Sequence, residues 1–298
     1  MKQDNIIKGM ISGLLAFFML AVMNVFAKLL SENHHVVEIA FFRNLIATLP
    51  FLFLIFVMKK KEILKINQRP RGVIARAVIG TISLITTFAA FAAMPMADTT
   101  AFLFTASLFI PILGIIFLSE KVGPYRWGAI MIGFVGVMVM LQPTGNFNSV
   151  GVTLALSAAL MHAVLQTILR YLGKTEKPET ITFYFVAIGT LIAALPLPWL
   201  FTMPSWDEIP LFLGVGISGV LAQFLLSIAF GNAPAAVVTV FNYSGLIWAT
   251  FFGWIIWQEW PSEAIFIGGI IVISSNIFMI WRESRQRKLK GERIKAGF

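Results

Sequence analysis

The chain has 298 residues, of which 58% are hydrophobic and only 12% are charged, with a mean hydropathy of +0.85 and a formal net charge of +9. Soluble domains carry about 25% charged residues, so this chain has too few charges to cover a water-soluble surface. The composition therefore excludes an ordinary soluble protein and predicts one that crosses a membrane many times.

Ten apolar runs, separated by charged or turn-forming residues, follow one another along the chain. A spanning helix needs about 20 apolar residues. The runs are continuous, without the alternation of a β-barrel, and in lipid a helix satisfies its own backbone. The sequence therefore predicts an all-α integral membrane protein with ten transmembrane helices. The predicted spans are 9–30, 36–58, 72–93, 99–118, 124–141, 149–169, 180–202, 210–230, 235–256 and 262–281.

The basic residues are distributed unevenly between the two predicted sides. With a cytoplasmic N-terminus, 20 of the 23 Lys and Arg residues lie at the cytoplasmic side, and Lys28, Arg43 and Arg76 lie within spans. This pattern predicts a multi-pass protein of the cell (inner or plasma) membrane with both termini cytoplasmic. The basic tail then touches anionic lipid, and no nucleic-acid partner is expected.

The two halves of the chain carry similar motifs at a nearly constant offset. Pro95 in AAMPMADTTAF matches Pro234 in GNAPAAVVTVF, and Glu120 in LSEK matches Glu259 in WQEW, each 139 residues apart. Five spans in each half make the second copy enter the membrane from the opposite side, so we expect inverted repeats around a central cavity. The predicted parts are a first repeat 1–142, a second repeat 143–282 and a basic tail 283–298.

Three stretches, AKLLSENHHVVEIAFFRN (27–44), the segment 94–141 and FNYSGLIWATFFGWIIWQEWPS (241–262), resemble the drug/metabolite transporter superfamily in its EamA-like branch. The resemblance covers essentially the whole chain. It implies a central cavity lined by spans 1, 3, 4, 6, 8 and 9, and carriers of S-adenosylmethionine, riboflavin or amino-acid-like metabolites. The second half departs from the first, because Ile181 stands at the position that matches Arg43.

Polar residues that share a helix face within the spans are candidates for the transport pathway. Asn24 and Lys28 are spaced i, i+4, as are their repeat mates His162 and Gln166. The alternative is hydrogen bonding between packed helices, which is worth about 0.6–2 kcal/mol per contact. A largely aromatic cavity with few polar groups suits an organic solute with a polar head. The further candidates are Thr105, Gln223, Ser227, Asn242, Tyr243 and Trp248.

Glu38 and Arg43 are charged residues inside the second apolar run. Five residues apart, they point about 140° away from each other on a helix, so they are poor partners. We expect Arg43 to clamp a neighbouring helix and Glu38 to pair with Lys28 or a loop. A charge in an external vestibule or a snorkelling side chain is the alternative for Arg43.

Four further residues are expected to act in structure or gating. Asp98 is expected to cap the fourth span, because a carboxylate suits the free N–H groups of a helix start. Pro111 permits a kink within that span. Glu120 and Glu259 end the fourth and ninth spans at opposite faces.

These features favour a secondary transporter of a small organic metabolite that works by alternating access, with an amino-acid-like, S-adenosylmethionine-like or aromatic substrate. A passive channel is the alternative. An intramembrane enzyme is disfavoured, because no catalytic or metal-binding constellation is present in the spans. No cofactor or metal is expected, and the predicted partners are the metabolite and the lipid bilayer, with the protein acting as a monomer.

Overall fold

The computed structural model describes residues 6–118, 124–141, 148–173, 175–233, 238 and 241–295. Throughout these ranges the chain is helical with short turns, and no strand occurs in them. The elements are α1 (Ile6–Leu30), α2 (Val36–Phe56), η1 (Lys61–Leu64), α3 (Pro70–Ala93), α4 (Met96–Leu103), α5 (Ala106–Leu118), α6 (Pro124–Leu141), α7 (Ser149–Leu172), α8 (Pro178–Ala194), α9 (Leu197–Leu200), α10 (Ile209–Asn232), α12 (Ser244–Trp257) and α13 (Glu263–Lys295).

In the described part of the chain, five helices are long and apolar enough to cross a membrane, and shorter apolar helices occupy the places of the remaining predicted spans. The long segments are Ile7–Leu30, Val36–Phe56, Pro70–Ala93, Ser149–Leu169 and Ile209–Ala229. Many of their large apolar side chains remain exposed, as lipid-facing residues do. The all-helical membrane fold is confirmed, whereas the number of crossings and the inverted relation of the halves stay predictions.

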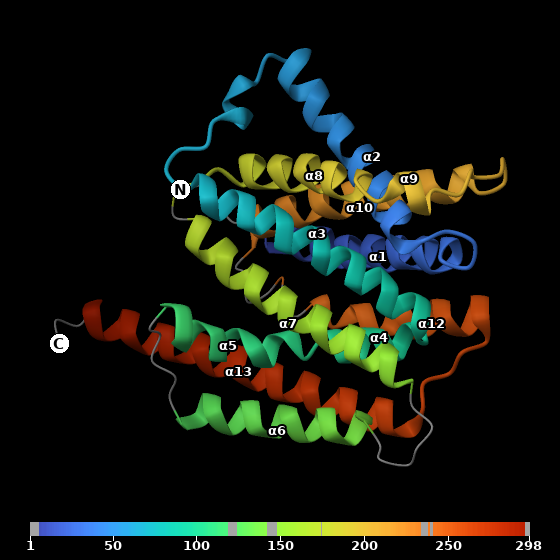
Figure 1. Cartoon of the computed structure of the whole chain (residues 1–298). Helices are drawn as coiled ribbons and strands as arrows, with labels where there is room; N and C mark the ends of the chain where they lie inside the picture. Colours follow the sequence, from blue (N-terminus) through green and yellow to red (C-terminus); the bar gives the residue numbers. More distant parts are fainter. Residues whose placement is uncertain are drawn as a thin grey trace.

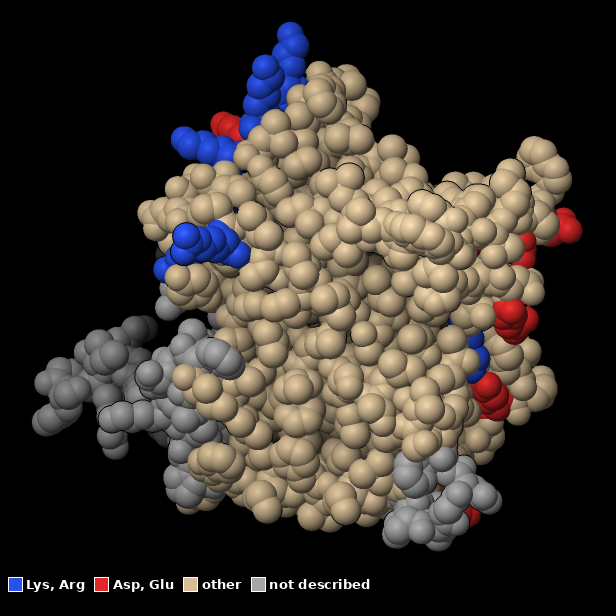
Figure 2. All heavy atoms as spheres, in the orientation of Figure 1, with Lys and Arg blue, Asp and Glu red and all other residues tan. Residues whose placement is uncertain are grey.

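The two termini lie at the same end of the helix bundle, on the left of Figure 1. Figure 2 shows Lys and Arg gathered toward that side and Asp and Glu along the opposite one. We call the first the basic end, which includes the turns 57–69 and 173–177. The second is the acidic end, which includes the turns 31–35, 201–208 and 258–262.

Three of the predicted spans are broken within the described residues, and the seventh divides into α8 and α9. The fourth divides into α4 and α5 at Phe104 and Thr105, so the break precedes Pro111, which lies inside α5. In the ninth, α12 begins at Ser244, which places Asn242 and Tyr243 just before this helix instead of within it. The expected mid-helix position of Asn242 and Tyr243 is therefore corrected, whereas the kink at Pro111 stays a prediction.

The breaks in the fourth and ninth spans carry the same kind of hydrogen bond. Thr105 Oγ1 donates to the carbonyl of Phe102 at 2.7 Å, and Ser244 Oγ donates to the carbonyl of Phe241 at 2.7 Å. A hydroxyl that bonds the carbonyl three residues back competes with the helical backbone pattern. The two hydroxyl residues are 139 residues apart, which is the offset of the repeated motifs.

The last helix of the first half, α6, packs closely against the last helix of the second half, α13. A Cβ atom at Gly136 of α6 would lie 2.8 Å from the carbonyl oxygen of Gly268 on α13, so only glycine allows this approach. The two helices lie side by side in Figure 1. The helix α13 also continues to Lys295, so residues 283–295 of the predicted tail extend the last helix.

Candidate functional site

Lys28 and Glu259 form an ion pair at the acidic end of the bundle. Lys28 Nζ lies 2.8 and 2.9 Å from the two carboxylate oxygens and also donates to the carbonyl of Met94 at 3.0 Å. Its charge lies 4.8 Å from the ring centroid of Trp257. Only 9% of the Lys28 side chain is exposed. The contact therefore links α1 in the first half to the end of α12 in the second half, and Lys28 does not pair with Glu38 as one alternative had it.

Glu259 also accepts a hydrogen bond from the start of α4, the role that the sequence analysis predicted for Asp98. The backbone N–H of Met96, the first residue of α4, donates to Glu259 Oε2 at 3.3 Å. Asp98 makes no capping hydrogen bond, and its Oδ1 is buried without a partner among the described residues. The hydrogen bond at the start of α4 thus goes to a carboxylate from the other half, while Asp98 itself lies in the first turn of α4, near the positive end of the helix. The repeat mate Glu120 lies outside the described residues.

An apolar layer lies next to this ion pair. Val25, Phe91, Met96 and Ala249 are buried together, from α1, α3, α4 and α12. Partly buried residues, Trp257 among them, pack against the four. These apolar contacts join four helices beside Lys28 and Glu259.

Several polar candidates lie in the interior with unused hydrogen-bonding atoms. Within the described part of the chain, Asn24 Oδ1 and Trp248 Nε1 are buried and without partners. Thr105 is fully buried, but its hydroxyl is already bonded to the backbone. Tyr243 packs edge to face on Phe104, and Asn242 is half-buried beside it. A free acceptor and a free donor in an aromatic surrounding are the groups that orient a small ligand.

The other pathway candidates are more dispersed. On α7, His162 is half-buried while Gln166 is exposed, so the pair does not enter the interior together. On α10, Gln223 is half-buried and Ser227 is exposed, on the face that carries the exposed Phe224. The Ser227 hydroxyl bonds the carbonyl of Gln223 at 2.9 Å. Of these four side chains, Gln166 and Ser227 thus lie on exposed faces of their helices.

Arg43 lies in a buried position between helices. Its Nη1 donates to Asn44 Oδ1 at 2.9 Å, and its guanidinium carbon lies 5.7 Å from the ring centroid of Phe185 on α8. Gly219 on α10 leaves the room for it, since a Cβ there would lie 3.1 Å from Arg43 Nε. Arg43 therefore approaches two neighbouring helices, and its hydrogen bond among the described residues is to Asn44 on its own helix. It lies at a depth of about 10 Å from the start of α2.

Glu38 belongs to a separate polar cluster at the acidic end. Its Oε2 lies 3.2 Å from His34 Nδ1 and accepts from the backbone N–H of Thr202 at 3.3 Å. The other ring nitrogen of His34 lies 3.2 Å from Glu208 Oε2. Hydrogen bonds from the N–H and hydroxyl of Ser205, together with those from His34 and Asn33, lower the pKa of Glu208 to about 2. Glu38 thus holds two loops, which agrees with the loop alternative.

Two residues of consequence escaped the sequence analysis. His34 was not singled out, although it is 4% exposed and lies between two carboxylates. Arg76 was only noted as a charge within a span, yet its guanidinium carbon lies 4.4 Å from the centroid of the same Phe185 ring that Arg43 approaches. Its position as an arginine within a predicted span would have been sufficient reason to list Arg76 as a candidate site residue.

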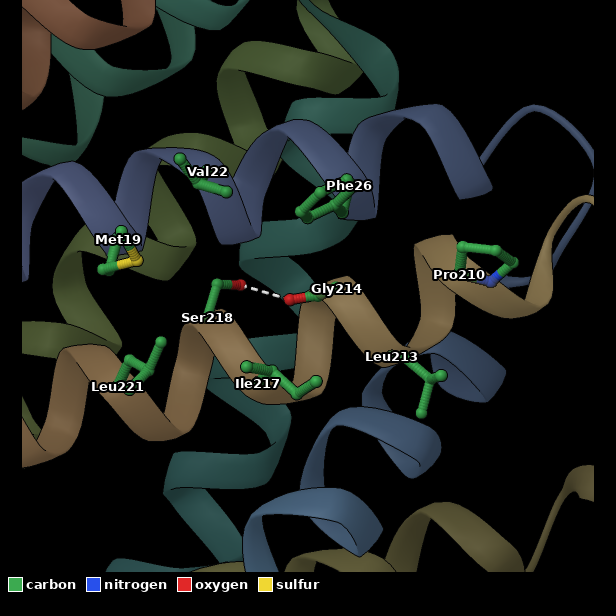
Figure 3. A pocket seen from close by; sticks show the side chains of 9 residues that line it. All are labelled: Met19, Val22, Phe26, Pro210, Leu213, Gly214, Ile217, Ser218 and Leu221. Atoms are coloured by element: carbon green, nitrogen blue, oxygen red, sulfur yellow. Dashed lines mark hydrogen bonds between the residues drawn. The ribbon is translucent and has the colours of Figure 1, made fainter.

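A groove of about 390 Å³ runs along α1 and α10 (Figure 3). Its lining is apolar, with Met19, Phe26, Leu213 and Leu221 among its side chains, except for Ser218. The Ser218 hydroxyl is bonded to the carbonyl of Gly214, as the dashed line in Figure 3 marks. The groove therefore lacks the free polar groups that orient a metabolite.

Comparison with known proteins identifies the family. The model of the EamA-like transporter family matches residues 7–142 and again 149–281, nearly the whole chain. The chain belongs to the EamA-like transporter family. It is thus a multi-pass membrane protein of the drug/metabolite transporter superfamily, and its two matched segments coincide closely with the two predicted repeats.

Named relatives of this EamA-like chain transport small metabolites. It is 28% identical to the pseudopaline exporter CntI of Pseudomonas aeruginosa over 91% of this chain and 95% of that one. It is 29% identical to a riboflavin transporter of Rhizobium johnstonii over 80% of each chain. It is 30% identical to an S-adenosylmethionine uptake transporter of Rickettsia felis over 90% of this chain and 91% of that one.

A solved crystal structure of a protein aligns with 96% of this chain and 99% of that chain, with a TM-score of 0.64. The sequence identity is 14%, so the likeness concerns the fold alone.

Proposed function

We propose that this protein is a secondary transporter of a small organic metabolite that works by alternating access, with its basic end in the cytoplasm. The observation that carries the proposal is the closure at the acidic end, where Lys28 and Glu259 join the two halves above a buried apolar layer. A carrier must close one side of its central site while the other is open, and a contact between halves is where such closure acts.

The energetics of this closure fit a gate. Breaking a buried ion pair costs a few kcal/mol, which is large enough to hold the acidic end shut at rest. The cost is also within the range that a ligand supplies when it binds one conformation better than another. Lys28 and Glu259 would then separate when the site opens to the outside.

The relatives support a metabolite with an organic body and polar groups as the substrate. Their names point to pseudopaline, riboflavin and S-adenosylmethionine, and we propose an amino-acid-like, S-adenosylmethionine-like or aromatic solute for this chain. Phe18, Trp248 and Phe252 pack together on α1 and α12 and provide an aromatic wall for such a body.

Counterflow in proteoliposomes tests the proposal and separates a carrier from a channel. A thermal-shift screen of the purified protein against metabolites, including S-adenosylmethionine, riboflavin and amino acids, first selects the solute. We expect unlabelled solute on one side to accelerate movement of labelled solute from the other, because a carrier returns faster when loaded. Flux that rises linearly with concentration and shows no such acceleration would point to a channel and contradict the proposal.

A further inference from the structure

Two arginines from different helices meet at one aromatic ring in the middle of the bundle. The guanidinium carbons of Arg43 on α2 and Arg76 on α3 lie 5.7 and 4.4 Å from the ring centroid of Phe185 on α8. Like charges so close repel each other. Something must offset that cost for the arrangement to be stable.

The described residues do not supply the missing negative charge. No carboxylate within them forms an ion pair with either arginine. Phe185 can stabilise each cation through its ring face, which is worth about 0.5–2 kcal/mol per contact. This is less than the several kcal/mol that burial of an ion costs.

The cluster also contains buried hydrogen-bond donors that have no acceptor among the described residues. Within the described chain, Arg43 Nε, Asn44 Nδ2 and Arg76 Nε and Nη1 are buried and unpartnered. Arg43 is 3% exposed and Asn44 is fully buried. A Cβ at Gly189 would lie 2.7 Å from Asn44 Nδ2, so Asn44 also approaches α8. Four unpaired donor atoms, three of them on two cationic residues, describe a site for an acceptor that carries negative charge.

The residues of this cluster are not equally buried. Arg76 and its neighbour on α7, His162, are half-buried, whereas Arg43 is buried. His162 lies close enough to Arg76 to interact with its charge. We infer that a solute would approach the donors from Arg76, beside the contact between α3 and α7.

We propose that Arg43, Asn44 and Arg76 form an anion subsite that binds a carboxylate of the transported solute, an inference that rests on the proposed transport function. Guanidinium groups pair with carboxylates and phosphates in a planar fork. The carboxylate is favoured because a doubly charged phosphate costs much more to desolvate at this depth. The substrate class is then a metabolite with a free carboxylate and an apolar or aromatic body.

Matched pairs of ligands test the subsite without knowledge of the natural substrate. The thermal unfolding midpoint of the purified full-length protein is measured with phenylacetate, 3-phenylpropionate and indole-3-acetate, and with the corresponding amides at equal concentration. We expect a carboxylate to raise the midpoint and its amide to leave it unchanged. Equal shifts from carboxylates and amides, or no shift from any carboxylate, would overturn the proposal, as would equal stabilisation by chloride or greater stabilisation by phenyl phosphate.

Single substitutions test whether the carboxylate binds at this cluster. Arg76→Gln should lower the apparent affinity for the carboxylate by about tenfold or more, since one charge-assisted pair is lost. Arg76→Lys, which keeps the charge but not the fork, should lie between the two. Arg71→Gln, an exposed arginine on the same helix, is the matched control and should bind as the wild type does. Unchanged carboxylate affinity in Arg76→Gln would refute the assignment, and the wild-type comparison of acid with amide stands even if a variant fails to fold.

Counterflow distinguishes failure of the subsite from failure of the transport function. If the protein exchanges a solute but carboxylates and amides act alike, the subsite is wrong and the carrier remains. If no solute shows counterflow, the transport function is wrong, whichever ligands bind.

Discussion

Phe104 and Tyr243 form an edge-to-face aromatic pair, with ring centroids 5.4 Å apart and an angle of 76° between the rings. Each residue stands at the break of a helix, and the two are 139 residues apart, the offset that relates the motifs of the two halves. A pseudo-two-fold axis brings equivalent residues together where it passes between the halves. The pair is the contact expected next to such an axis, and it favours the inverted-repeat arrangement that we predict.

Replacing Tyr243 tests how much this contact stabilises the two halves. We expect Tyr243→Ala to lower the free energy of unfolding by about 2–4 kcal/mol, because a large aromatic residue leaves a cavity. Tyr243→Phe keeps the ring and should cost much less. A double-mutant cycle with Phe104→Ala should give a coupling of about 0.5–1.5 kcal/mol. Independent, additive effects of the two substitutions would show that the pair is incidental.

The Lys28–Glu259 pair should be worth more than a surface ion pair, because Lys28 is buried. Lys28→Met and Glu259→Gln should each destabilise the protein by about 2–4 kcal/mol, since each leaves one charge without its partner. The double variant should lose less than the sum of the two. Chemical unfolding in detergent measures all four proteins, with the exposed Glu263→Gln as control. Losses below about 0.5 kcal/mol would mean that the pair behaves as an exposed one.

The cluster around Glu208 gives a prediction of pH dependence. Because hydrogen bonds depress the pKa of Glu208 to about 2, its contribution to stability is complete above the ordinary value near 4.5 and is lost as the pH falls toward 2. Glu208→Gln should therefore lower the melting temperature at pH 7, and the difference from wild type should shrink between pH 4.5 and 2. Asp207→Asn, its exposed neighbour, should melt like the wild type. A difference that stays constant over this pH range would contradict the account.

At the basic end, Glu176 holds the turn between α2 and α3 to the turn between α7 and α8. Burial opposes its charge, but the backbone N–H groups of Asn67, Gln68 and Arg69 donate to its carboxylate at 2.7–2.9 Å and lower its pKa. Glu176→Ala should cost about 1–3 kcal/mol, because three donors lose a charged acceptor. The exposed Glu179→Ala on α8 is the control. Faster hydrogen exchange at residues 67–69 in Glu176→Ala alone should accompany the loss, and equal exchange in both variants would argue against this clamp.

Much of the fold could be read from the sequence, because composition, run length and the distribution of Lys and Arg report directly on the bilayer. The breaks at Phe104 and Tyr243 could not, since Thr105 and Ser244 look like ordinary small polar residues until their hydroxyls are seen to bond the carbonyl three residues back.

The site was harder to predict than the fold. Spacing on one helix correctly made Glu38 and Arg43 poor partners, but it does not reveal which distant residue completes a contact. The partner of Lys28 is 231 residues away, and the carboxylate at the start of α4 comes from Glu259, not from the nearby Asp98. Arg76 and His34 were missed for the same reason, because the residues around each come from several distant helices and loops.

The gate between Lys28 and Glu259 is tested most directly by a reversible cross-link. The chain has no cysteine, so Lys28→Cys with Glu259→Cys introduces the only two thiols. A short bis-methanethiosulfonate reagent joins them, a reductant releases them, and Lys28→Cys alone treated in the same way is the control. We predict that counterflow in proteoliposomes stops in the cross-linked protein and returns after reduction. Undiminished counterflow in fully cross-linked protein would contradict alternating access through this end of the bundle.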